Sequence, residues 1–347
     1  MWNDSVYVFA TDTEIFQLSP SVDWSETFKK WNWSGFHLKT IWKKLNLPIG
    51  HFNVKSDLMI EVNALTSKDC STFVKTVKAL ELPELDEKKS TIQDVFKSVV
   101  EIQKLAQQKL LVDDFTSILR DVEYPLISVL YKMEKFGFAL DSEQLHKFSL
   151  ELADQLSTLE QEIYTISGMP FNIGSPKQLS QVLFEKLGLE ASKKTKTGFS
   201  TDNDVLEKLN HPIVPLILDY RELAKLKSTY VDTLPSEVDK SDNRIHTTFN
   251  QALTATGRLS SHDPNLQNIP IKTERGQRVR KAFIADKGNK ILSVDYSQIE
   301  LRILAHYSDD KGLIQAFENN LDIHTATASE VFGVGLNQVT PDLRRIA

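Results

Sequence analysis

One carboxylate of this chain stands where a metal-dependent reaction could use it. Asp295 follows the apolar run 290–294, which is typical of a strand, and precedes a helical pattern over 298–307. A divalent ion that activates a nucleophile and holds phosphate oxygens needs hard oxygen ligands, and the Asp295 carboxylate with the Tyr296 carbonyl is a partial set for Mg2+. Aspartates at strand ends also cap the helix that follows, so the neighbouring residues must decide between the two roles.

Residues 254–270 offer hydrogen-bonding groups that could contact a nucleic acid. The run contains Arg258, Asn265, Gln267 and Asn268 among several hydroxyls, with few bulky apolar side chains. Such groups suit sugars, phosphates and minor-groove base edges, where acceptors are common to several base pairs. An ordinary surface loop is the alternative that composition alone leaves open.

Positive charge is concentrated around these residues. Ten Lys or Arg stand against five Asp or Glu between Arg244 and Arg302, a local charge of +5 in a chain whose net charge is -6. Phosphate-binding proteins often gather basic side chains on one face in this way. The cationic loop 192–201 is a second candidate for phosphate contact, although an isolated loop of this kind could be merely solvated.

Composition narrows the class of protein. A length of 347 residues with 41% hydrophobic content is enough for two or three domains with cores of their own. The single cysteine, Cys70, excludes a disulfide scaffold and a multi-cysteine zinc site. The sequence has neither a signal-peptide pattern nor an apolar run long enough to span a membrane, so we expect a cytoplasmic protein.

The elements that position the candidate residues fall into three stretches. Residues 1–115 carry strand patterns at 5–9 and 15–18 and helical patterns at 35–45 and 71–80, which predict a small α/β domain. The next stretch, up to residue 243, is predicted to be helical, and from residue 244 onward short strands and polar turns precede further helices.

Caps and stops punctuate the helical middle. Gly137 is expected to end a helix that runs from Asp121 to Phe136. Asp141 is a suitable N-cap for a long second helix, and Ser175-Pro176 supplies a cap and a first-turn proline for a third.

Three motifs together resemble a known family. The run 254–270, the sequence Asp295-Tyr-Ser-Gln-Ile-Glu-Leu-Arg-Ile-Leu-Ala-His306 and the sequence Asp322-Ile-His-Thr325 resemble the polymerase region of family A DNA polymerases, the bacterial DNA polymerase I type, in order and spacing. The resemblance is strongest over 244–347, good through the helical middle and faint in the first 115 residues.

The resemblance implies an α/β plus all-α fold in a right-hand architecture. In that arrangement residues 1–115 would be a degenerate 3′-5′ exonuclease-like domain of the ribonuclease H-like type, and 116–243 would be the thumb. Residues 244–304 would be the first part of the palm, and 305–347 the start of the fingers.

The activity implied is template-directed DNA synthesis in replication and repair. The 3′-hydroxyl of a primer attacks the α-phosphate of a deoxynucleoside triphosphate, and pyrophosphate leaves with the help of two Mg2+ ions. The partners implied are primer-template DNA and deoxynucleotides, with no membrane contact and a monomeric protein.

The resemblance also assigns roles to individual residues. Asp295 and the Tyr296 carbonyl match the magnesium ligands, and Glu300, next to Ile299 in the nucleotide site, matches a steric gate against a ribose 2′-hydroxyl. His324 and Arg344 match residues that contact the phosphates of the incoming nucleotide. The residues that match DNA contacts are Arg258, Asn265, Gln267 and Asn268 in the minor groove and Lys193, Lys194 and Lys196 at the tip of the thumb.

Two departures from the family's pattern predict a fragment that is inactive alone. A second metal-binding aspartate, which the family carries in a later His-Asp-Glu motif, is absent. The helical pattern that contains Arg344 also reaches Ala347 without a stop signal.

The exonuclease motifs of the family are incomplete in the first stretch. Asp12-Thr-Glu14 imitates the first motif at a position that better matches a later strand, and 37–40 lacks the aspartate of the second. No tyrosine lies between Tyr7 and Tyr124, which excludes the third motif. We therefore expect an exonuclease-like fold without exonuclease activity.

Two other functions stay open. The chain could be a non-catalytic DNA-binding module derived from a polymerase, because its DNA-contacting residues are present and its metal site is incomplete. A third hypothesis is a related single-subunit RNA polymerase, but Glu300 and the run 254–270 argue against it.

Overall fold

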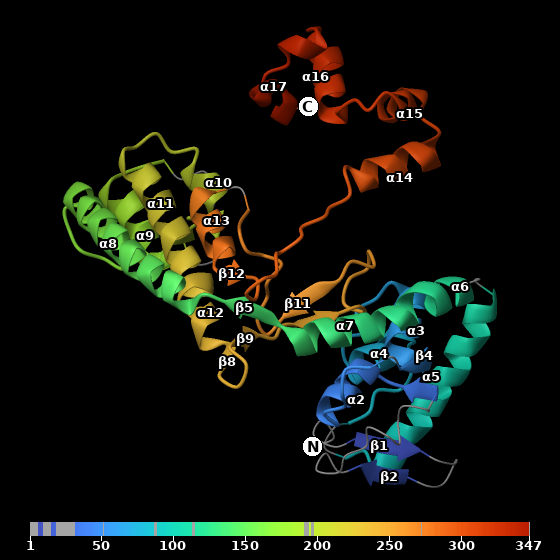
Figure 1. Cartoon of the computed structure of the whole chain (residues 1–347). Helices are drawn as coiled ribbons and strands as arrows, with labels where there is room; N and C mark the ends of the chain where they lie inside the picture. The colour runs from blue at the N-terminus through green and yellow to red at the C-terminus, as the bar shows by residue number, and fades with distance from the viewer. Residues whose placement is uncertain are drawn as a thin grey trace. The chain divides into compact units, whose positions relative to one another are not determined.

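The computed structural model describes residues 6–9, 15–18, 32–50, 52–86, 89–112, 115–190, 194–195, 198–271 and 273–346. The chain divides into two compact units, Met1–Asn289 and Lys290–Ala347. Helices and short strands both contribute, so the fold is of a mixed helical and sheet type (Figure 1). None of the helices in these ranges is both long and apolar enough to cross a membrane.

The N-terminal part of the first unit is a small α/β assembly. Its elements are β1 (Val6–Phe9), β2 (Ile15–Leu18), β3 (Asn32–Gly35), α2 (Leu38–Lys44), β4 (Asn53–Asp57), α3 (Leu58–Thr66), α4 (Phe73–Ala79) and α5 (Ile92–Val112). β1 and β2 pair antiparallel. β3, α2 and β4 follow one another in the chain as a βαβ unit, in which the two strands pair in parallel. The two predicted strands and the helices α2 and α4 are confirmed, and α3 and α5 were not predicted.

A buried aromatic cluster joins this part to the helices that follow. These are α6 (Thr116–Ile118), the π-helical η1 (Leu119–Glu123) and α7 (Tyr124–Phe136). Trp42 of α2 is fully buried, and its ring centroid lies 4.2 Å from that of Phe52 and 5.7 Å from that of Tyr131 on α7. α7 therefore packs on the N-terminal core, and Gly137, with a φ of 64°, ends it as the sequence predicts.

The middle of the chain is helical, as predicted. Its elements are β5 (Phe138–Leu140), α8 (Ser142–Ser167), α9 (Pro176–Ser180), η2 (Gln181–Lys186), β6 (Lys194–Thr195), β7 (Gly198–Phe199), α10 (Asn203–Leu206), α11 (Ile213–Leu226), η3 (Lys227–Val231) and α12 (Thr233–Ser236). Asp141 caps α8 by accepting a hydrogen bond from Gln144 N at 2.9 Å, and Ser175 caps α9. α8 and α11 lie side by side (Figure 1).

A small antiparallel sheet and a separate hairpin complete the first unit. The sheet has the order β12-β5-β9-β8, and the hairpin consists of β10 and β11. Their bounds, with that of the last helix of the unit, are β8 (Val238–Asp239), β9 (Arg244–Ile245), β10 (Thr248–Asn250), β11 (Ser260–His262), α13 (Glu274–Lys281) and β12 (Phe283–Ile284).

The second unit contains helices and one extended segment. The helices are α14 (Ile299–Ser308), α15 (Lys311–Glu318), α16 (Ile323–Phe332), the 3-10 turn η4 (Leu336–Gln338) and α17 (Pro341–Ile346). The strand predicted at 290–294 is wrong, since this segment has no regular structure and leaves Leu292 85% and Val294 82% exposed. A strand needs a neighbouring strand for its hydrogen bonds, and no described strand pairs with this segment.

Candidate functional site

Asp295 lies in the segment that leads into α14. Its side chain is exposed, and among the described residues it has no hydrogen bond or ion pair. The N-cap position of α14 belongs to Gln298, in a left-handed conformation with a φ of 52° and without a side-chain capping bond. Asp295 therefore does not cap the helix, and its carboxylate oxygens are not engaged by a described neighbour. Tyr296, whose carbonyl is the second predicted ligand, is 79% exposed.

The first turn of α14 carries the next two predicted site residues. Ile299 is 41% exposed, and Glu300 is exposed one position later. On the same helix the Arg302 guanidinium stacks over the Phe317 ring at 4.4 Å and donates to the Ser297 carbonyl at 3.0 Å. These contacts tie the start of α14 to α15 and to the turn after Asp295.

α16 and α17 bring a cation to the start of a helix. Arg344 of α17 donates to both carboxylate oxygens of Asp322, with Nε 3.0 Å and Nη2 2.8 Å away. Asp322 is the N-cap of α16 and accepts a hydrogen bond from Thr325 N at 2.8 Å. The Arg344 hydrogen bond, reinforced by those from Thr325, holds the pKa of Asp322 well below its usual range. Arg344 is thereby fixed beside the first turn of α16, where His324 lies.

The four predicted minor-groove residues gather on the hairpin and the turn after it. Arg258, Asn265, Gln267 and Asn268 are all exposed. Gln267 Nε2 donates to the Leu259 carbonyl at 3.1 Å, and Asn265 Oδ1 accepts from Gln267 N at 3.0 Å. The structure thus joins the turn after β11 to the strand connection that contains Arg258, so one hydrogen-bonded surface presents these side chains.

The predicted cationic loop is described only in part. Lys193 and Lys196 lie outside the described residues, and of Lys194 only the backbone is described. β6, which contains Lys194, pairs antiparallel with β7 as a short hairpin.

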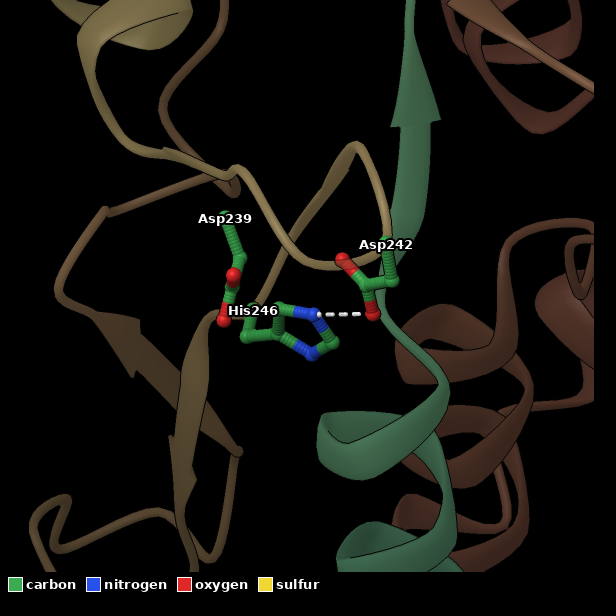
Figure 2. Close-up of side chains that lie close together, drawn as sticks. All are labelled: Asp239, Asp242 and His246. Atoms are coloured by element: carbon green, nitrogen blue, oxygen red, sulfur yellow. Dashed lines mark hydrogen bonds and ion pairs between the residues drawn. The ribbon is translucent and has the colours of Figure 1, made fainter.

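A cluster that the sequence analysis did not single out lies on the β8–β9 hairpin and the residue that follows it. Asp239, Asp242 and His246 have ligand atoms within 4.8 Å of one another (Figure 2). His246 Nε2 lies 3.0 Å from Asp242 Oδ2, and its Nδ1 lies 2.7 Å from the Glu134 carbonyl. Asp239 accepts from the backbone N–H of Ser241 at 2.8 Å. The short spacing of these three residues was the signal available in the sequence. Their hydrogen bonds stabilise the turn between β8 and β9.

The region compared with the exonuclease motifs has buried carboxylates that serve the fold. Asp12 and Glu14 lie outside the described residues. Asp57 is 1% exposed and accepts from His37 N at 3.1 Å and from Leu38 N at 2.7 Å, which caps α2, while burial raises its pKa to about 6. Glu61 is 2% exposed and accepts from the Tyr124 hydroxyl at 2.6 Å.

Comparison with protein families finds one match that covers more than half of the chain. The profile described as DNA polymerase family A matches residues 142–347. The matched range contains the β10–β11 hairpin, the segment around Asp295 and the α16–α17 pair.

Individual relatives give the same result. The chain is 47% identical to DNA polymerase I of Caldicellulosiruptor bescii over 317 residues, which is 89% of this chain and 37% of that polymerase. It is 54% identical to the thermostable DNA polymerase I of Thermus aquaticus over 234 residues, which is 66% of this chain and 28% of that protein. The chain thus matches between about a quarter and two fifths of the length of these relatives.

A solved structure resembles the fold described above. It is the POL domain of Pol1 from M. smegmatis in complex with a DNA primer-template and dNTP, with a TM-score of 0.77 and 39% sequence identity. The likeness covers 89% of this chain and 55% of that one.

Proposed function

Because the chain belongs to DNA polymerase family A, we propose that residues 1–347 carry part of an enzyme that synthesises DNA on a template in replication and repair. In the proposed reaction the primer 3′-hydroxyl attacks the α-phosphate of a deoxynucleoside triphosphate, the bond between the α-phosphorus and the bridging oxygen breaks, and pyrophosphate leaves. The extent of the family match carries the proposal, because 142–347 includes every proposed site residue.

The magnesium site is assigned to the Asp295 carboxylate and the Tyr296 carbonyl. Both offer hard oxygen atoms, which suit Mg2+, and the Asp295 carboxylate has no partner among the described residues that an ion would have to displace. Two bound Mg2+ ions would supply Lewis-acid stabilisation of the attacking and leaving oxygens. The role of Asp295 itself is to hold a negative charge immediately before α14.

The nucleotide site is assigned to the starts of α14 and α16. His324 lies in the first turn of α16, where backbone N–H groups and the helix dipole favour an anionic ligand. The Arg344 guanidinium, oriented by Asp322, adds a cation for the triphosphate. Glu300, beside Ile299, is the proposed gate against a ribose 2′-hydroxyl.

The DNA contacts are assigned to the hairpin surface and the cationic loop. Arg258, Asn265, Gln267 and Asn268 would contact sugars and minor-groove edges of the primer-template. The loop residues Lys193, Lys194 and Lys196 would contact duplex phosphates. The exposure of the four hairpin side chains supports this assignment.

The remaining parts are proposed to be supporting domains. We propose an exonuclease-like domain without exonuclease activity at 1–115, a thumb at 116–243, the first part of a palm at 244–304 and the start of the fingers at 305–347. The βαβ unit and the use of Asp57 for helix capping support the first of these.

A chimaera tests the proposed function. The 317 aligned residues of C. bescii DNA polymerase I are replaced by those of this chain, and primer extension with Mg2+ and deoxynucleotides is measured. We expect extension, because the remainder of that polymerase would complete the site. A folded chimaera that binds primer-template DNA without extending it would support the non-catalytic DNA-binding module instead.

The same assay applied to residues 1–347 tests the expectation that this stretch is inactive alone. It holds one carboxylate of the pair that a two-metal site requires, so binding of primer-template DNA without extension is expected. Binding should weaken steeply between about 50 and 200 mM salt because phosphate contacts release counterions. Extension by this stretch alone would overturn the claim that a second metal ligand is missing.

A further inference from the structure

A buried ion pair joins the β10–β11 hairpin to the N-terminal α/β part. Glu134 of α7 is 2% exposed, and its Oε1 accepts from Lys39 Nζ of α2 at 2.5 Å and from Phe249 N of β10 at 2.7 Å. Lys39 Nζ, itself buried, also donates to the Phe249 carbonyl. The pair therefore engages both backbone groups of Phe249, which in an antiparallel strand point to the same side. The Glu134 and Lys39 side chains therefore bind the edge of β10 with which no described strand pairs.

Neighbouring contacts extend this attachment along the strand. Lys43 Nζ lies 3.0 Å from Glu134 Oε2, although without hydrogen-bond geometry, and donates to Thr248 Oγ1 at 3.2 Å. The Ala252 carbonyl accepts from Cys70 N at 2.8 Å, and the Ala252 side chain is buried in the same core as Trp42. These contacts thus attach the strand from its first residue, Thr248, to Ala252, the second residue of the connection to β11.

The attached strand is continuous with the surface that presents the proposed DNA contacts. Phe249 pairs in register with Ser261 of β11, and Ser261 Oγ accepts from Leu266 N at 3.1 Å. The far side of the turn is held by the Tyr230 hydroxyl, which donates to the Asn268 carbonyl at 2.6 Å. A shift of β10 along its own axis would therefore move β11 and the connection that contains Arg258 relative to Asn268, and so disturb the surface that they share.

We propose that Glu134 and Lys39 are positioning residues, through which the N-terminal α/β part fixes the register of the hairpin that contacts the minor groove. This inference rests on the proposed function, because it takes the hairpin to be a DNA-contacting surface. A buried ion pair gives little net stability compared with apolar side chains of similar volume. Its bonds to the N–H and the C=O of one particular residue, Phe249, however, hold β10 at one register, which an apolar contact does not specify.

The test combines DNA affinity with hydrogen exchange on residues 1–347. In Glu134→Gln the shape is kept and the charge facing Lys39 is lost. We expect amide exchange in 248–262 to quicken and the Kd for primer-template DNA, measured by fluorescence anisotropy, to rise about tenfold, which corresponds to ~1.4 kcal/mol. The control Tyr124→Phe removes a hydrogen bond to buried Glu61 from the same helix but leaves both bonds to Phe249 intact, and should change neither quantity.

A second variant separates positioning from stability. The double substitution Lys39→Met with Glu134→Leu replaces the pair by apolar side chains of similar size, so the N-terminal core should stay packed and the variant should remain folded, with the loss confined to the two bonds to Phe249. We still expect faster exchange in the hairpin and weaker DNA binding. Unchanged exchange and unchanged affinity in this folded variant would overturn the proposal.

The DNA affinity and the exchange rates distinguish a failure of the proposed function from a failure of the positioning role. If the unaltered chain bound no primer-template DNA, the proposed function would fall, while the exchange data would still decide whether the pair holds the hairpin. If the variants loosened the hairpin and bound DNA as tightly as before, the positioning role would be overturned and the proposed function would stand.

Discussion

Three buried carboxylates of the first unit and the exposed carboxylate of Asp295 in the second unit stand in opposite situations. In the first unit Asp57, Glu61 and Glu134 are at most 2% exposed, and each accepts hydrogen bonds from protein groups. In the second unit Asp295 is exposed and has no partner among the described residues. A buried acid must be satisfied by the fold that surrounds it, whereas an exposed acid is free to take a ligand. The difference separates carboxylates that hold the molecule together from one that is available for chemistry.

Substitution of Asp295 should give the largest effect, and only on activity. In the chimaera with C. bescii DNA polymerase I, Asp295→Ala should lower the rate of primer extension by at least about 1,000-fold, or ~4 kcal/mol, because a charge-stabilising ligand is lost. The melting temperature and the Kd for primer-template DNA should stay within error, since the side chain has no described partner. Retained extension would remove Asp295 from the metal site.

Substitution of Asp57 should give the converse result. Asp57→Ala leaves the N–H groups of His37, Leu38 and Met59 without their acceptor at the starts of α2 and α3, at a cost of about 3 kcal/mol in the free energy of unfolding. Urea denaturation measures this loss. Asp57→Asn is the matched control, because it keeps one oxygen acceptor and should cost less. An equal loss in both variants would mean that the charge, rather than the capping bonds, is what the fold uses.

The sequence predicts features that depend on local chemistry. The stop at Gly137 and the caps at Asp141 and Ser175 are confirmed, because a glycine at positive φ or a side-chain oxygen facing a free N–H acts within one turn. The strand at 290–294 is wrong, since an apolar run becomes a strand only where another strand accepts its hydrogen bonds.

In the candidate site, too, the sequence predicted only features that depend on local sequence. Its motifs identify the family, and the roles of Asp295, Glu300, His324 and Arg344 stay predictions. The contact of Glu134 with Phe249 joins residues 115 positions apart, and no local pattern marks a glutamate in an amphipathic helix as the partner of a distant peptide group. The bidentate bond between Arg344 and Asp322, 22 positions apart, was missed for the same reason.

The smallest expected effect is on the pH dependence of stability, and it concerns His37 and Asp57 in the first unit. Burial, reinforced by the charges of Lys39 and Lys43, lowers the pKa of His37 from 6.5 to about 4. The unfolded chain therefore takes up a proton at this side chain that the folded chain does not. The stability that His37 contributes is present above about pH 6.5 and is lost as the pH falls towards 4, by about 2 kcal/mol between pH 7 and 4.5.

Asp57, whose carboxylate accepts from the His37 backbone, shifts in the opposite sense. Its pKa is raised from 3.8 to about 6, so its contribution to stability is present below pH 3.8 and is lost as the pH rises through 6. In the unaltered chain the two trends oppose each other between pH 4 and 6. His37→Gln should remove one of them, so that this variant gains stability relative to the unaltered chain on acidification from pH 7 to 4.5. Urea midpoints at the two pH values measure the change, and the exposed His146→Gln is the control. If the difference in urea midpoint between His37→Gln and the unaltered chain stayed constant with pH, protonation of His37 would not govern the acid response. The contrast between the buried carboxylates and exposed Asp295 would then rest on hydrogen bonding alone.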